Sequence, residues 1–327
     1  MKADEDFADF PIDLGAEWIH NLPGILDVLS GVEGTASQTD LIPYHLKSAA
    51  TWNGRRLRQH YRLELDAFFR FFPEFKFKSS TWYDFFRRHF ADEVQHRIQY
   101  NSPVAKVDYS GERVEVTTAN GERFVVDKVI MTASIGVLRS GHIAFVPELS
   151  QRKKDALASV EFLPGFKLLL KFSEKFYPDA ISIKGSSGEQ AFYDVAFRKD
   201  APPGCHVLGL LVTGHDATAP YYALGSEEQI VTAALTQLDA MFPKNAASRA
   251  YTGEYRLEDW GRRPFVLGTW VEGFKIGRAT RASLNTPLGD KVYFAGEAHD
   301  VHRQMGVPGA VLSGLHAVDR LVRAGAK

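Results

Sequence analysis

The residues best suited to ligand chemistry lie near the carboxyl end of the chain, where an apolar strand predicted at 291–295 is followed by Glu297. A loop then leads to a predicted helix that begins at residues 308–310, which read Pro-Gly-Ala. Proline suits the first helical turn, and the free N–H groups at a helix N-terminus attract electron-rich ligands. A carboxylate at the carboxyl end of a strand lies where open α/β sheets bind ligands. An ordinary strand-to-helix connection with a solvated glutamate has the same pattern, so spacing alone leaves both interpretations open.

Other reactive side chains give weaker signals. His299 and His302 are spaced three residues apart, but no further ligand is evident, so we expect no metal site. Cys205 follows the run Pro202-Pro203-Gly204, and we do not expect it to be a nucleophile. A single cysteine also excludes an internal disulfide. It favours a reducing compartment, so we expect a cytoplasmic protein.

The composition excludes several classes of protein. The chain has 327 residues, which corresponds to about two domains. Its 39 basic and 40 acidic residues give a net charge of -1, which argues against binding to nucleic acid or to an acidic membrane. The acidic N-terminus lacks the apolar core of a signal peptide, and no apolar run approaches the roughly 18 residues of a membrane span.

The elements that must position these residues follow from periodicity. Residues 61–99 show the three- and four-residue spacing of one or two amphipathic helices. Residues 104–133 alternate with a period of two, and Asn120-Gly121 is a strong hairpin signal, which predicts a three-stranded meander that leads into a buried strand. We also predict helices at 150–160, 226–241 and 309–322, and strands at 166–172, 207–213, 251–257 and 268–271.

Three segments of the chain carry recognisable motifs. Residues 291–297 read Lys-Val-Tyr-Phe-Ala-Gly-Glu, and residues 306–315 read Gly-Val-Pro-Gly-Ala-Val-Leu-Ser-Gly-Leu. Residues 13–20 read Asp-Leu-Gly-Ala-Glu-Trp-Ile-His. In order along the chain, these motifs and the segments 101–138, 143–149 and 166–178 resemble the FAD-dependent amine oxidases. That family includes the polyamine oxidases, the monoamine oxidases and the lysine-specific histone demethylases. The resemblance covers about 11–24 and 100–327, and residues 13–20 are most similar to the spermine and acetylpolyamine oxidases.

The resemblance implies FAD as cofactor and assigns residues to it. Glu297 would bind the ribityl hydroxyls, and Val104 would lie near the adenine. Gly309 and Ala310 would present the N-terminus of the last helix to the pyrimidine ring of the flavin. The flavin would carry out the oxidation, while the protein orients it and excludes competing reactions.

The resemblance also implies roles around the reacting amine. Ala16 and Trp18 would lie against the flavin, and Lys167 would hold a water at flavin N5. His20 would lie near the substrate amine, and Trp270 would line the substrate tunnel. Each role has a plainer alternative: an edge charge for the lysine, a hydrogen-bonded loop residue for the histidine and core packing for the tryptophan.

The chain departs from the family in several segments. Family members open with a βαβ unit of about 30 residues whose Gly-x-Gly-x-x-Gly turn cradles the pyrophosphate, and no such unit is found here. Region 25–99 is also shorter than its family counterpart. Gly306 and Pro308 stand where the family has an aromatic residue or threonine and a histidine. One wall of the aromatic cage around the amine would therefore be open.

We predict an α/β protein with an incomplete Rossmann-like FAD-binding domain at 1–24, 100–145 and 280–327. A substrate domain of mixed sheet and helices would occupy 25–99 and 146–279. The predicted function is oxidation of a polyamine-type amine to an imine and an aldehyde, with hydride transfer to flavin N5, molecular oxygen as partner and hydrogen peroxide as product. The alternatives are an inactive remnant without FAD that acts as a binding module, and a related flavin enzyme with another substrate. Sheet edges left by the absent unit could pair two chains in a homodimer.

Overall fold

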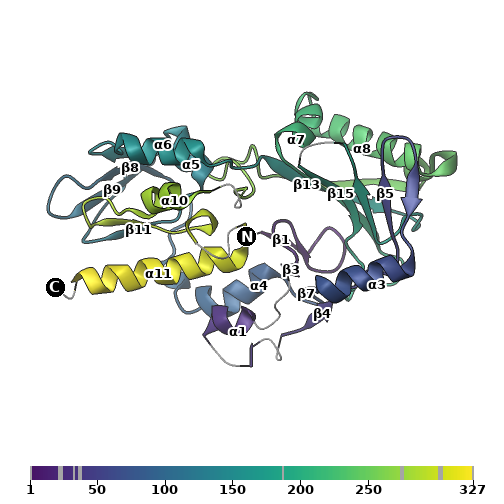
Figure 1. Cartoon of the computed structure of the whole chain (residues 1–327), viewed down its shortest axis with the longest axis horizontal. Coiled ribbons are helices and arrows are strands. Elements are labelled where there is room, and N and C mark those ends of the chain that lie inside the picture. The colour runs from purple at the N-terminus through teal and green to yellow at the C-terminus, as the bar shows by residue number, and fades with distance from the viewer. Residues whose placement is uncertain are drawn as a thin grey trace. The chain divides into compact units, whose positions relative to one another are not determined.

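The computed structural model describes residues 2–20, 25–31, 34–35, 39–185, 188–272, 276–300 and 305–325. The chain divides into two compact units (Figure 1). The first comprises Met1–Gln95 and Gly165–Asp259, and the second comprises His96–Pro164 and Trp260–Lys327. Within the described residues, no helix is both long enough and apolar enough to cross a bilayer.

The first unit is built on a seven-stranded sheet. Its strands run in the order β17 (Tyr251–Asp259), β13 (Gly165–Phe172), β16 (His206–Thr213), β15 (Glu189–Asp194), β14 (Ala180–Ile183), β5 (Ala49–Trp52) and β6 (Leu57–Gln59). Only β14 and β5 pair in parallel among these neighbours, and β13 pairs antiparallel with both β16 and β17. The strands predicted at 166–172, 207–213 and 251–257 are confirmed.

One face of this sheet forms the main apolar core. Helices α7 (His215–Tyr222), α8 (Glu227–Met241) and α9 (Ala246–Ala250) contribute to this core, and Figure 1 shows α7 and α8 along the sheet. Phe166, Leu168 and Leu170 of β13 belong to the core. Because successive residues of a strand point to opposite faces, Lys167 lies on the other face of the sheet. The candidate site described below includes Lys167 on that face.

Smaller elements complete the first unit. They are the pair β1 (Ala3–Asp4) and β2 (Ile12–Asp13), the sheet of β3 (Ile19–His20), β7 (Glu74–Phe77) and β4 (Leu41–Pro43), and helices α1 (Ile25–Ser30), α3 (Arg62–Phe71) and α4 (Trp82–Phe86). The helical prediction for 61–99 is therefore only partly right, because β7 separates α3 from α4. Pro73 cannot continue the helix, and the residues after it alternate as Glu-Phe-Lys-Phe.

The second unit contains the predicted meander. Its strands run in the order β10 (Arg123–Val126), β9 (Val114–Thr118), β8 (Val104–Asp108) and β12 (Ala144–Val146). The hairpin at 120–121 is confirmed, with Gly121 at a φ of 84°. Strand β12 adds to β8 in parallel, which the sequence pattern did not indicate.

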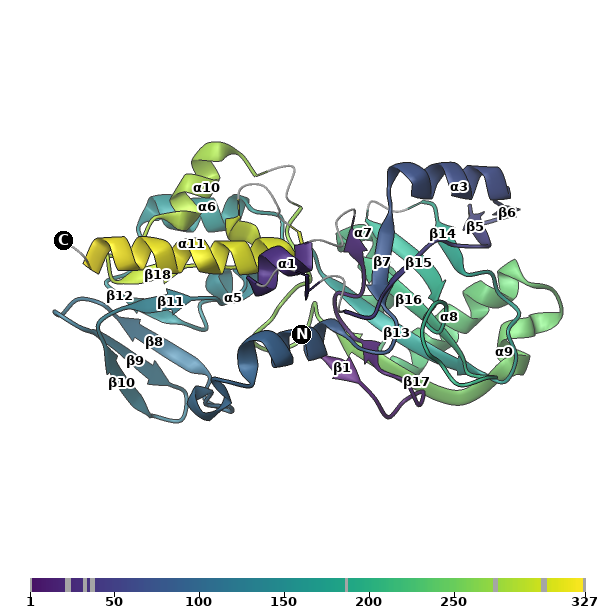
Figure 2. The same ribbon diagram turned by 90° about the horizontal axis from the view of Figure 1, so that it is seen from below.

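A two-stranded parallel sheet forms the Rossmann-like part of the second unit. It pairs β11 (Val129–Met131) with β18 (Val292–Phe294). Helices α5 (Ile135–Ser140), α6 (Gln151–Ser159), α10 (Arg278–Asn285) and α11 (Val307–Gly325) surround it. Figure 2 shows α11 running along β18, and Ala317 packs against Tyr293 at this contact. The predicted strand at 268–271 does not form, since only Val271 makes an isolated bridge, to Phe162. The α/β fold class is confirmed.

The two units group the segments differently from the predicted domains. Residues 2–20, which we assigned with the cofactor domain, belong to the first unit because residues 13–17 are hydrogen bonded to Lys167 of β13. Residues 146–164 and 260–272 belong to the second unit, where α6 packs against α10. Which part of the chain would bind the cofactor and which the substrate remains a prediction.

Candidate active site

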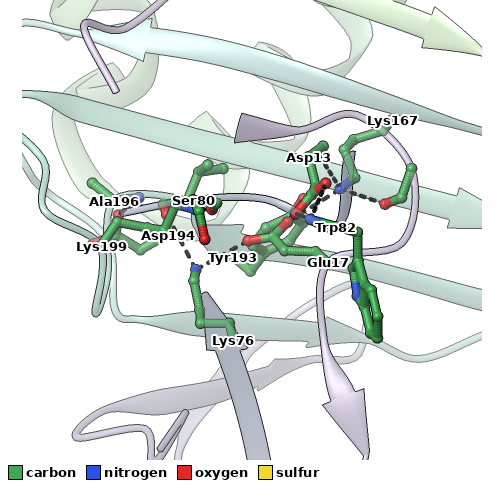
Figure 3. Close-up of polar contacts among 12 residues, drawn as sticks. Asp13, Glu17, Lys76, Ser80, Trp82, Lys167, Tyr193, Asp194, Ala196 and Lys199 are labelled. Carbon is green, nitrogen blue, oxygen red and sulfur yellow. Dashed lines mark hydrogen bonds and ion pairs between the residues drawn. The ribbon is translucent and has the colours of Figure 1, made fainter. Parts of the chain in front are cut away.

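Lys167 is enclosed by the loop that carries the motif at residues 13–20. Its side chain is only 2% exposed, on the face of β13 opposite the main core. Its Nζ donates hydrogen bonds to the backbone oxygens of Asp13 at 2.7 Å and Gly15 at 3.0 Å, and to Glu17 Oε2 at 3.1 Å (Figure 3). A lysine ammonium has three N–H donors, so these three acceptors match its full capacity.

Glu17 is the centre of this buried cluster. Its Oε1 accepts a hydrogen bond from Lys76 Nζ at 3.0 Å, and its Oε2 accepts bonds from Lys167 Nζ and from Tyr193 Oη at 3.0 Å. Burial alone would raise the pKa of Glu17, but the nearby charges of Lys76 and Lys167 outweigh it and lower the pKa to about 2. Glu17 is therefore an anion bound by two cations. The four residues come from the 13–20 loop and from strands β7, β13 and β15.

The seven-stranded sheet leaves room for the Tyr193 ring because the residue opposite it is a glycine. Its partner on β16 is Gly209, where a Cβ atom would lie 2.7 Å from Tyr193 Cζ. Only glycine therefore leaves room for the ring at this register position. The Trp18 ring packs edge-on against Tyr193 and Tyr44, with centroid distances of 4.9 and 5.9 Å. The position of the Trp18 indole is thus linked through Tyr193 to Glu17.

Asp13 adds a second carboxyl group to the cluster. It is buried and accepts the backbone N–H of Trp82, the first residue of α4, at 3.2 Å from each carboxylate oxygen. Burial, together with the negative charge of Glu17, raises the pKa of Asp13 to about 7. This carboxyl group therefore changes charge near neutral pH.

His20 lies at the exposed end of the same segment. Its Nδ1 is 2.7 Å from Oε2 of Glu74, and this hydrogen bond is the main reason that the pKa of His20 is raised. The charge of Glu189 raises the pKa of His20 further, and burial raises the pKa of Glu189 itself. Two carboxyl groups therefore lie near one imidazole, and the His20 side chain is 70% exposed.

The residues predicted for the flavin are divided between the two units. Lys167, Trp18 and His20, with the exposed Ala16, belong to the first unit. The second unit contains the other predicted residues, which are Val104 at the start of β8, Glu297 after β18, the half-buried Trp270, Gly306, Gly309 and Ala310. Gly306 accepts the N–H of Ala310 at 3.3 Å through its backbone oxygen, in the first turn of α11. The roles of these residues toward flavin and substrate remain predictions.

Glu297 has the properties expected of a group that meets a ligand hydroxyl. Its Oε2 accepts the backbone N–H groups of Met305 at 3.2 Å and Val271 at 3.5 Å. Burial outweighs these bonds and raises the pKa of Glu297 to about 7. A hydroxyl that donates to this carboxyl group would offset the cost of burying it. Ser313 fixes α11 beside it, because its Oγ accepts the N–H of Gly296 at 2.9 Å and lies 2.8 Å from the Gly296 oxygen.

These observations test the fit of the chain to FAD. Glu297 and the adjacent first turn of α11 suit the ribityl and flavin end of the cofactor. The sequence contains no glycine-rich strand–turn–helix for the pyrophosphate. Among the described residues, no group of three or more side chains could hold a metal ion, and His302 lies outside those residues. The donor set therefore fits the flavin end of the cofactor.

Comparison with known proteins decides the family. Residues 66–322 match the family of flavin containing amine oxidoreductases. The chain belongs to this family. Among relatives of this chain, polyamine oxidase 1 of Zea mays is 31% identical over 245 residues, which cover 72% of this chain and 47% of that protein. Lysine-specific histone demethylase 2 of Homo sapiens is 27% identical over 233 residues, which cover 68% of this chain and 28% of that protein. The matched part of the chain thus spans about half of the length of the maize protein and less than a third of the length of the human protein.

Solved structures show the same fold. A putrescine oxidase variant superimposes with a TM-score of 0.74 at 14% identity, covering 98% of this chain and 90% of that chain. Cyclohexylamine oxidase from Brevibacterium oxydans gives a TM-score of 0.72 at 13% identity, covering 97% of this chain and 89% of that chain. At these identities the likeness is one of fold.

Several residues of the candidate site were not singled out from the sequence. Glu17 lies inside the quoted motif, but its charge between Ala16 and Trp18 was not interpreted. The alternation of Lys76 between two phenylalanines was a signal for a strand, and a buried lysine in such a strand needs an anion. Tyr193 and Glu74 gave no local signal, because only the tertiary pairing brings them to the 13–20 loop.

Proposed function

We propose that this chain is the catalytic part of a flavin-dependent oxidase of polyamine-type amines. The amine would lose a hydride and a proton to give an imine, which water converts to an aldehyde. Molecular oxygen would take up two electrons and two protons to give hydrogen peroxide. FAD, when bound, supplies the two-electron acceptor that no amino-acid side chain can provide.

The observation that carries the proposal is the acidic group around His20. Glu74 Oε2 lies 2.7 Å from the imidazole Nδ1, the charge of Glu189 acts on the same ring, and His20 belongs to the segment that also carries Ala16 and Trp18. A polyamine has several cationic nitrogens, so carboxylates can hold one nitrogen while another reacts as the neutral amine. A substrate with a single amine would gain nothing from this second contact.

The chain's own residues would bind the cofactor and orient the substrate against it. Trp18, packed edge-on against Tyr193 and Tyr44, offers a rigid aromatic wall. Glu297 would hold the ribityl hydroxyls, and the first turn of α11 would face the pyrimidine ring. The relationship to polyamine oxidase 1 of Zea mays supports the choice of substrate class.

A second candidate is a binding module of the same fold that lacks flavin. Whether the chain retains flavin distinguishes this candidate from the oxidase. We also propose, for either function, that the protein is cytoplasmic and that two chains form a homodimer through their sheet edges.

Steady-state oxidation with peroxide detection tests the proposal. The FAD-supplied chain is assayed with spermine, spermidine and cyclohexylamine, alongside Glu74→Gln, Glu189→Gln and the control Glu254→Gln, whose carboxylate pairs with Lys171 at an exposed site. We expect each of the two test variants to raise KM for the polyamines by about tenfold and to leave cyclohexylamine unchanged, because one charge-assisted bond is lost. Equal effects on mono- and polyamines would contradict the assignment of substrate class. A complete lack of turnover would favour the binding module.

A further inference from the structure

The acceptors around Lys167 all come from one short segment. Asp13, Gly15 and Glu17 supply the two backbone oxygens and the carboxylate that surround its Nζ. A neutral amine has only two N–H donors and a lone pair that would face an oxygen, so three acceptors select the ammonium form. In this arrangement Lys167 has no N–H left for a water molecule.

Both carboxylate oxygens of Glu17 also accept hydrogen bonds from buried side chains. Lys76 reaches Oε1 and also donates to the backbone oxygen of Val195 at 3.2 Å, while Lys167 and Tyr193 reach Oε2 (Figure 3). The two lysines are 1% and 2% exposed. A carboxylate that accepts bonds from three strands has one orientation, so the backbone of the loop at residue 17 is fixed as well.

This arrangement determines where the neighbouring residues lie. Glu17 points into the protein, and the residues on either side of it alternate, with Ala16 exposed and Trp18 half-buried. Ala16 and Trp18 are the residues predicted to lie against the flavin. Tyr193, whose hydroxyl bonds to Glu17, is also the closest aromatic neighbour of Trp18, with a centroid distance of 4.9 Å.

We propose that Lys167, Glu17 and Lys76 form an ionic clamp that positions the Ala16–Trp18 segment, with Lys167 as one of the two fixed cations of this clamp. The clamp is a property of the folded chain. Its importance for amine oxidation rests on the proposed function. Lys167 and Glu17 are thus positioning residues, which act on the flavin and the substrate through the 15–18 loop.

Hydrogen exchange of the intact chain without added flavin tests the clamp directly. In Glu17→Gln and Lys167→Met we expect amides within residues 12–20 to exchange at least about tenfold faster, because the bonds that order this loop are lost. Amides of β16 and α8 should keep their rates. Lys171→Met is the matched control, since Lys171 lies on the same strand and face but pairs at the surface with Glu254. Unchanged exchange at 12–20 in Glu17→Gln would overturn the proposal.

A milder variant keeps the test informative if Glu17→Gln or Lys167→Met fails to fold. Tyr193→Phe removes one of the three bonds to Glu17 and leaves both lysines in place. We expect a smaller increase in exchange, confined to residues 12–20. An effect spread evenly over the first unit in every variant would mean that the cluster stabilises the whole unit and does not position the loop.

Turnover separates positioning from direct action on the flavin. If Lys167 acts through the loop, Glu17→Gln and Lys167→Met should lower kcat by similar factors, and the double variant should be no worse than either single one. A loss in Lys167→Met that exceeds the loss in Glu17→Gln by 100-fold or more, and that adds to it in the double variant, would instead show a direct contact of Lys167 with the reaction. Because exchange is measured without flavin, a failure of the proposed oxidase activity leaves the test of the clamp intact.

Discussion

Asp13→Asn should make the protein more stable above neutral pH. Burial and the charge of Glu17 raise the pKa of Asp13 from 3.8 to about 7 in the folded chain. Between these values the unfolded chain loses the proton while the folded chain keeps it. The folded state therefore binds more protons, and the stability contributed by Asp13 falls as the pH rises through this window.

The size of the effect follows from the width of the window. About three pH units, at about 1.4 kcal/mol for each, give a loss of at most about 4 kcal/mol at pH 8. Asparagine resembles the protonated carboxyl group and can still accept the N–H of Trp82. The variant should therefore match the wild type near pH 4 and exceed it by a few kcal/mol at pH 8.

Urea unfolding of both proteins between pH 4 and pH 8 measures this difference. With an m-value of about 3 kcal/mol per M, the variant's midpoint at pH 8 should lie about 1 M higher. The comparison of the two proteins cancels the other titrating groups, such as His299, whose pKa is lowered to about 4 mainly by burial. A constant difference between wild type and Asp13→Asn across this range would refute the assignment of Asp13 as a buried carboxyl group that titrates near neutrality.

Three further changes probe other parts of the site. Glu17→Gln leaves two buried lysines without their anion and should lower the free energy of unfolding by about 3–5 kcal/mol, whereas the exposed pair removed by Glu254→Gln is worth about 1 kcal/mol or less. Thermal unfolding compares the two, and equal effects would contradict the buried cluster. Gly209→Ala should cost about 1–3 kcal/mol by displacing the Tyr193 ring, and urea unfolding that matches the wild type would show that the ring has room. Glu297→Ala should raise the Kd for FAD by about 10–100-fold, since one bond to a charged group is lost, and equilibrium dialysis with an unaltered Kd would remove this carboxyl group from the cofactor site.

Local patterns predicted much of the framework. The two-residue alternation and the Asn120-Gly121 turn predicted the meander, and Ser150 and Ser226 cap α6 and α8 by accepting backbone N–H groups. These features depend on neighbouring residues only. The prediction failed at 61–99, where a run of aromatic residues hid the strand β7 after Pro73. Aromatic residues fit helices and strands alike, so their spacing was ambiguous.

The candidate site was predicted only in part. The motif at 13–20 pointed to Trp18 and His20, and the segment 166–178 pointed to Lys167. The clamp, however, depends on partners 59 to 176 positions from Glu17 in sequence, such as Lys76 and Tyr193. Periodicity cannot reveal such pairs. The local signals were two charges, Glu17 inside the motif and Lys76 between two phenylalanines, because a buried charge requires a partner of opposite sign.

We propose that this chain uses flavin, and the visible absorbance of the purified chain tests this proposal most directly. The chain is incubated with excess FAD, passed through gel filtration, and its spectrum recorded before and after anaerobic addition of spermidine. The account predicts flavin bands that stay with the protein and bleach with the amine. A colourless protein after incubation with excess FAD would contradict it, and would leave an amine-oxidase fold that serves as a binding module.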